Sequence, residues 1–140
     1  MTDQPLVVQS KSQVYSNLVF PQVQALIEQH SGRKDDSLKR YRSLCKRSGG
    51  LLRSVGLIQW LSFLAAKAAR DEVHHQYLLD NLVSELNTIK DNFNVKSSDD
   101  LLQIVRNQSL PEYMCTTTQV LKLIQWHKHI ADILITAGEG

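Results

Sequence analysis

Apolar residues recur every three or four positions along most of the chain, which is the spacing of helices with one buried face. We find no segment with the strict alternation that is typical of a half-buried strand. The spacing predicts helices over residues 10–30, 38–55, 57–69, 71–91, 98–107 and 109–136. We therefore expect an all-α fold, a single compact bundle of about six helices over residues 10–140, preceded by a flexible N-terminus at residues 1–9.

The predicted helix at 57–69 is apolar on nearly every side, interrupted only by Gln59, Ser62 and Lys67. A helix that is apolar all round is normally buried all round, so we expect it to be the buried central helix of the bundle. The next helix carries apolar residues at alternating intervals of three and four, as in a coiled-coil seam. These residues are Leu79, Leu82, Leu86, Ile89 and Phe93.

Proline and glycine mark irregular positions in this pattern. Pro21 lies inside the first predicted helix, where the missing N–H and the ring favour a bend near residues 17–20. Gly49 and Gly50 weaken the second helix and predict a kink or a short break. Gly56 lies between the second and third helices, where a left-handed residue can end one helix and let the next begin.

Capping residues give the expected helix ends. Gly32 is a stop signal for the first helix, and Asp36 is a suitable N-cap for the second. Ser98 is the predicted cap of the short fifth helix. Ser109 and Glu112 have the spacing of a capping box at the start of the last helix.

The charges are strongly segregated along the sequence. Residues 33–70 hold ten bases and two acids, a net charge of +8, whereas the remainder has a net charge of −6. No acid occurs between residues 37 and 70. Such asymmetry indicates two faces with different partners, one of which would attract a polyanion.

The cations of the second helix fall on one side of it. At 100° per residue, four of them occupy an arc of about 60° opposite the apolar side, and Arg40 and Arg47 flank the apolar side on its other edge. An ordinary solvated helix usually mixes charges of both signs, because acid–base pairs one turn apart stabilise it. This pattern therefore favours a polyanion-binding face, and its candidate binding residues are Lys39, Arg42, Lys46, Arg47 and Arg53.

Catalytic motifs are absent from the sequence, which contains no HExxH, GxSxG or phosphate-binding loop. His74 and His75 are adjacent, so on a helix they point about 100° apart and cannot easily chelate one ion together. We therefore expect a protein that is not an enzyme, with no catalytic residues, no cofactor and no metal site. The competing hypothesis is a small metal-dependent hydrolase that uses His74, His75 and Asp80.

Cysteines and tryptophans are expected in the core. Cys45 and Cys115 are too few for a disulfide scaffold, and both lie beside apolar residues in helical patterns. Trp60 and Trp126 could stack on bases, but each lies within an apolar helix, so core packing is favoured. Tyr41 lies on the apolar side of the basic helix and has the same interpretation.

The N-terminus lacks the cationic and apolar pattern of a signal peptide, and no apolar run reaches the length of a membrane span. From these features we expect a soluble protein of the cytoplasm that has no membrane partner.

Three segments together resemble one known family. They are YRSLCKRSGGLLRSVGLIQWLSFLAAK at 41–67, HHQYLLDNLVSEL at 74–86 and LPEYMCTTTQVLKLIQWHKHIADILI at 110–135. The ordered set is similar to the small subunit of the CRISPR type III-B RNA-silencing effector, the Cmr complex. The resemblance extends from about residue 38 to 135. Many members of the family have proline where this chain has Gly49.

This resemblance implies a non-catalytic structural subunit that works in antiviral defence. Its expected partners are guide RNA and target RNA, the backbone and large subunits of the Cmr complex, and copies of itself along the filament. RNA would be contacted through its phosphates, which gives affinity without reading sequence. The alternative is an unrelated helical protein–protein adaptor whose basic face docks an acidic partner.

Overall fold

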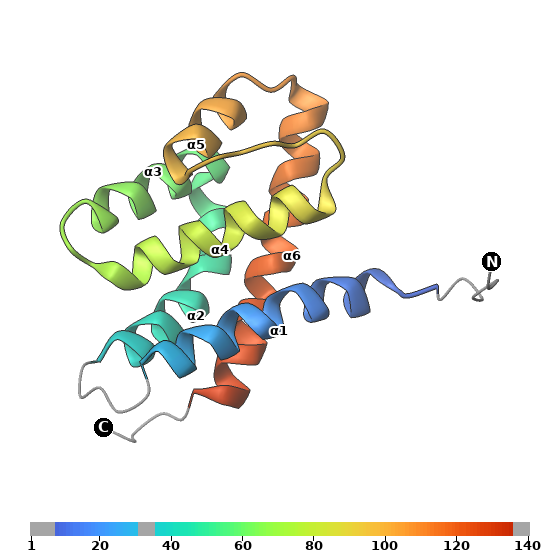
Figure 1. The fold of residues 1–140 in the computed structure, drawn as a ribbon. Coiled ribbons are helices and arrows are strands. Elements are labelled where there is room, and N and C mark those ends of the chain that lie inside the picture. Colours follow the sequence, from blue (N-terminus) through green and yellow to red (C-terminus); the bar gives the residue numbers. More distant parts are fainter. Residues whose placement is uncertain (1–7, 31–35, 136–140) are drawn as a thin grey trace.

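The computed structural model describes residues 8–30 and 36–135, and these form an all-α bundle (Figure 1). The predicted fold class is therefore confirmed. The helices are α1 (Lys11–Gln29), α2 (Ser37–Val55), α3 (Leu57–Ala68), α4 (Val73–Ile89), α5 (Ser98–Arg106) and α6 (Leu110–Leu134). The expected stop at Gly32, the end of the last helix at residue 136 and most of the N-terminal segment 1–9 lie outside the described residues.

Two helices organise the packing. The longest, α6, runs through the length of the bundle and packs against α1, α2 and α4 (Figure 1). The helix α4 crosses the middle and packs against α1, α2, α3 and α5 as well. The predicted seam of α4 faces the core, because Leu79, Leu82 and Leu86 are buried, while Ile89 and Phe93 are partly buried.

The helix α3 is less enclosed than its composition suggests. Leu57, Trp60 and Leu64 are fully buried, and this face packs against α4, α2 and α5. The opposite side, with Gln59, Ser62 and Ala66, is exposed. The expectation that this helix is covered on every side was wrong, because its exposed residues are two polar side chains and one small alanine, which tolerate water at little cost.

The two internal glycines do not break the basic helix. The helix α2 continues through Gly49 and Gly50, since the buried residues on either side hold it against α4 and α6. Likewise α1 continues through Pro21. By contrast, Gly56 has φ 87° and ψ 167°, a conformation that is essentially restricted to glycine, and it separates α2 from α3 as predicted.

The helix starts follow the predicted capping chemistry with small shifts. Ser109 and Glu112 form the expected capping box at α6. The cap of α5 is Ser97 rather than Ser98, and its hydroxyl accepts from the N–H of Asp100. Asp36 occupies the N-cap position of α2, but its side chain makes no capping hydrogen bond. None of the helices in the described ranges is long and apolar enough to cross a membrane.

Candidate nucleic-acid interface

The solvent side of α2 carries all of its cations. Arg40, Lys46, Arg47 and Arg53 are exposed, and Lys39 and Arg42 are half-buried. The opposite side is the core face, with Tyr41, Leu44, Cys45, Ser48 and Leu52 buried. The structure therefore keeps the amphipathic division that the sequence predicted, and the cations form one surface of the bundle.

One candidate is neutralised by a residue distant in sequence. The Nε of Arg42 lies 3.0 Å from Oδ1 of Asp132 on α6, with side chains 22% and 33% exposed. This ion pair ties α2 to the end of α6 and uses part of the positive charge. Arg42 is thus in part a structural residue, which its place in the sequence stripe did not reveal.

The other cations divide into two groups. Lys39, Lys46 and Arg53 make no ion pair with any described residue, so their charges face solvent. Arg47 lies toward the other edge of α2, where with Arg40 it acts electrostatically on His74 of α4. The Arg47 Nε also donates to the carbonyl of Ser43 one turn earlier, at 3.4 Å. We call the group formed by Lys39, Lys46 and Arg53 the basic face.

A buried polar network holds the inner side of α2 in place. The hydroxyl of Tyr41 lies 2.8 Å from Nδ1 of His127 and accepts from the amide of Asn81 at 3.2 Å. The Nε2 of His127 lies 2.8 Å and 2.9 Å from the two carboxylate oxygens of Glu85. These residues come from α2, α4 and α6, and all four are buried. The network therefore fixes the orientation of α2 relative to two other helices.

Burial dominates the ionisation of this network. It raises the pKa of the Glu85 carboxyl, although His127 partly opposes that shift. It also raises the pKa of Tyr41 and of the Cys45 thiol, so both stay protonated at neutral pH. A protonated, enclosed thiol is not a nucleophile. Both cysteines are free, but Cys115 is exposed, so the expectation of burial was wrong for that residue.

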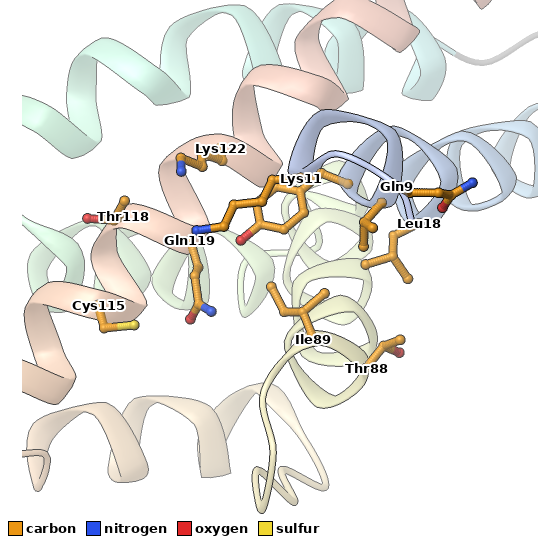
Figure 2. A pocket seen from close by; sticks show the side chains of 11 residues that line it. Gln9, Lys11, Leu18, Thr88, Ile89, Cys115, Thr118, Gln119 and Lys122 are labelled. Atoms are coloured by element: carbon orange, nitrogen blue, oxygen red, sulfur yellow. The ribbon is translucent and has the colours of Figure 1, made fainter. Parts of the chain in front are cut away.

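One pocket lies away from the basic face. It has a volume of about 610 Å³ and lies between the start of α1, the end of α4 and the first half of α6. Figure 2 shows Lys11, Lys122, Leu18, Ile89 and Cys115 among the side chains that line it. No carboxylate or imidazole is among the residues that line this pocket, so it offers no acid–base pair for catalysis.

The two adjacent histidines lie closer together than their helical positions suggested. The ring centroids of His74 and His75 are 4.2 Å apart, and both residues are buried. Each contributes one possible ligand atom to a group with Glu72 in which all such atoms lie within 4.8 Å of one another. The expectation that these histidines cannot approach one ion was wrong, because rotation about the side-chain bonds brings the two rings together although they leave the helix about 100° apart. Asp80, in contrast, is exposed and accepts from Gln76.

Comparison with known proteins places the chain in a family. The family model for the CRISPR-associated protein Cas_Cmr5 matches residues 11–134, which include every helix of the bundle. The chain belongs to the Cmr5 family. No curated protein sequence matches it.

A solved structure of this family has the same fold. The crystal structure of a CRISPR-associated Cmr5 family protein from Thermus thermophilus superposes with a TM-score of 0.70 at 23% sequence identity. The match covers 91% of this chain and 100% of the other. Membership of the Cmr5 family implies a component of a Cmr complex, which favours this interpretation over an unrelated adaptor.

Several residues of this Cmr5-family chain could not be recognised from sequence alone. No local sequence pattern marks Asp132 as an ion-pair partner, because Arg42 lies on another helix. Glu85 and Asn81 lie among the leucines of α4, and only their position on an apolar face hinted at buried polar partners. His127 falls on the apolar side of α6, where a buried imidazole requires a partner.

Proposed function

We propose that this Cmr5-family chain is a non-catalytic structural subunit of a CRISPR type III-B ribonucleoprotein in antiviral defence. Its basic face binds the sugar-phosphate backbone of guide and target RNA, with Arg47 and Arg42 at the margins. The observation that carries the proposal is the set of exposed cations on α2 that no described carboxylate neutralises. Contacts of this kind suit a subunit that serves any guide, because phosphates carry no sequence information.

The dimensions of α2 support this role. From Lys39 to Arg53 the helix rises about 21 Å at 1.5 Å per residue, which is enough to follow several nucleotides. The buried network of Tyr41, His127 and Glu85 holds the helix rigid, so the cations are positioned before RNA arrives. A rigid array loses less conformational entropy on binding than cations on a mobile loop would.

The acid–base chemistry of the described residues supports a non-catalytic role. The Glu85–His127 pair is enclosed in the core and has no route to a substrate. The pocket in Figure 2 contains an exposed cysteine, Cys115, but no general base among its lining residues. RNA cleavage would then belong to other subunits of the complex.

Both ends of α6 present apolar side chains to solvent. Leu110 and Met114 in its first turns are 70% and 60% exposed, and Ile133 near its other end is 75% exposed. Different patches at opposite ends of one subunit favour head-to-tail contacts, which build filaments rather than closed dimers. They support a subunit that stacks with copies of itself and with backbone and large subunits.

The experiment for RNA binding replaces Lys39, Lys46 and Arg53 together with glutamine in the assembled complex. RNA affinity is then measured over a series of salt concentrations. Each lost phosphate contact lowers the log–log salt slope by about 0.7 for a single strand, so the triple variant should lose about 2 in slope. Arg42 is left intact because its ion pair supports the fold.

The matched control removes three exposed cations from other surfaces, Lys96, Arg106 and Lys122, again with glutamine. It has the same net charge as the test variant. If the two variants bind RNA equally well, net charge alone determines affinity and the basic face has no special role.

Stacking is tested by Met114→Glu and Ile133→Glu, each compared with Gln125→Glu on the exposed middle of α6. Sedimentation analysis of the assembled complex should show loss of this subunit with either end variant and full occupancy with the control. Full occupancy in all three would contradict stacking through the ends of α6.

A further inference from the structure

The turn between α3 and α4 gathers side chains that neither RNA binding nor stacking uses. Glu72 precedes α4, and His74 and His75 lie in its first turn. The turn is closed by hydrogen bonds from the N–H of Asp71 to the Ala68 carbonyl and from the N–H of Glu72 to the Lys67 carbonyl. Glu72 is therefore held beside the two imidazoles by the backbone.

The imidazoles are enclosed and incompletely partnered. His74 and His75 are 5% and 2% exposed. The Nδ1 of His75 is buried and has no hydrogen-bond partner, although buried polar atoms in proteins nearly always have one. The Phe63 and His75 rings pack in a T-shaped arrangement, with centroids 5.8 Å apart. An unsatisfied ring nitrogen beside a second imidazole and a carboxylate indicates a missing ligand.

The charges around the two imidazoles have both signs. Arg40 and Arg47 act electrostatically on His74, and Arg47 and Lys67 act on His75. The carboxylate of Glu72 acts on both rings with the opposite sign and is the anionic ligand that a cation would need here.

We propose that Glu72, His74 and His75 form a binding site for one divalent transition-metal ion of the zinc class. Two imidazoles and one carboxylate, with a fourth position open to water, are a common ligand set for zinc. Ligand atoms around tetrahedral zinc lie about 3.4 Å apart, given bonds of roughly 2.1 Å. The present separations of up to 4.8 Å thus require the side chains to close by about 1.4 Å, which rotation of the half-buried Glu72 allows.

The bound ion would join the end of α3 to the start of α4 as a clamp. Glu72 would exchange its weak contact with Lys67, whose Nζ lies 3.7 Å away, for a metal bond. This inference does not depend on the proposed RNA binding, because the basic face uses other residues.

Untagged protein is first stripped of metal with a chelator. ZnCl₂ is then titrated into it at pH 7, and the binding is followed by calorimetry. The background carries Cys115→Ser, because the exposed thiol is itself a zinc ligand. We expect one ion per chain and a higher melting temperature in its presence. Cobalt in place of zinc should give the visible absorption of a low-symmetry site without thiolate bands.

The variants that identify the ligands are Glu72→Gln and His74→Asn, each of which should weaken binding at least tenfold. His129→Asn, which removes an exposed imidazole on α6, is the control and should bind as the parent does. Because Glu72 is only half-buried, its variant tests the site even if His74→Asn fails to fold.

Absence of saturable binding, or binding that Glu72→Gln leaves unchanged, would overturn the metal site. It would also be overturned if inorganic phosphate, with no metal present, raised the melting temperature of the parent but not of His75→Asn. That result would show an anion site that uses Arg40 and Arg47 instead.

Discussion

The two sides of α2 differ in how their charges and polar groups are satisfied. The outer side presents Lys39, Lys46 and Arg53 to water, with no described carboxylate beside them. The inner side places Tyr41 in a closed network with Asn81, Glu85 and His127, in which three helices supply the partners. One side of the helix thus specifies the packing of the bundle, and the other is left unpaired for a partner.

Electrostatic pairing contributes more to stability on the inner side of α2 than on the outer side. Charges in water gain little from a neighbour because solvent screens them, whereas a buried charge without its partner is costly. Substitutions on the inner side should therefore change stability, and substitutions on the outer side should change binding.

The largest effect is expected from breaking the buried network. His127→Leu removes the partner of Glu85 and leaves a buried carboxyl without compensation, which should lower the free energy of unfolding by about 3–5 kcal/mol. Urea denaturation gives the value. Gln125→Leu, on the exposed side of the same helix, should stay within about 0.5 kcal/mol. Similar losses for both variants would show that the network is not specially important.

The second effect compares two glycines. Gly56→Ala forces a side chain into a backbone conformation of positive φ and should cost about 1–3 kcal/mol. Gly50→Ala places a methyl group in open space on the outer side of α2, and should stabilise the protein by about 0.4–1 kcal/mol. Thermal melts of the two variants should therefore shift in opposite directions. A destabilised Gly50→Ala would mean that the helix needs flexibility at that position.

The third effect concerns the ion pair at the margin of the basic face. Asp132→Asn frees Arg42 and should lower stability by less than about 1 kcal/mol, since both side chains are partly exposed. It should also raise RNA affinity and increase the salt slope by about 0.7, because one more cation is available. Asp99→Asn makes the same charge change at an exposed position of α5, and it should leave the salt slope unchanged. An unchanged slope for Asp132→Asn would place Arg42 outside the RNA site.

The smallest effect is a change in pH dependence. The folded pKa of Glu85 is raised, so its contribution to stability is greatest below its unfolded pKa and is lost as the pH rises through the folded pKa. The glutamine of the Glu85→Gln variant is uncharged at every pH, so the variant does not lose stability in this way. The melting temperature of the variant relative to the parent should therefore rise between pH 4 and pH 7. A constant difference over that range would show that burial does not raise the pKa of Glu85.

Much of the fold could be predicted from local patterns. The spacing of apolar residues gave the number and order of the helices, and the Ser109–Glu112 capping box gave the start of α6. No break occurs at Gly49 and Gly50, because tertiary packing outweighs about 1 kcal/mol of helix propensity per glycine. Composition was a poorer guide for α3, whose outer side is exposed at Gln59, Ser62 and Ala66.

The candidate site was predictable only where it depends on α2 alone. The exposed side of that helix follows from its own periodicity. The pairing of Arg42 with Asp132 depends on how α2 packs against α6, and so does the contact between Tyr41 and His127. The convergence of His74, His75 and Glu72 depends on the turn that precedes α4, which helical geometry alone does not describe.

The most direct measurement places a photoreactive benzoylphenylalanine at Ser43, an exposed position between the cations of α2, in the assembled complex. Gln103, exposed on α5, serves as the control position. After irradiation, we expect cross-links to RNA from position 43 and none from position 103. RNA cross-links from position 103 alone, or equally from both positions, would contradict the assignment of RNA binding to α2.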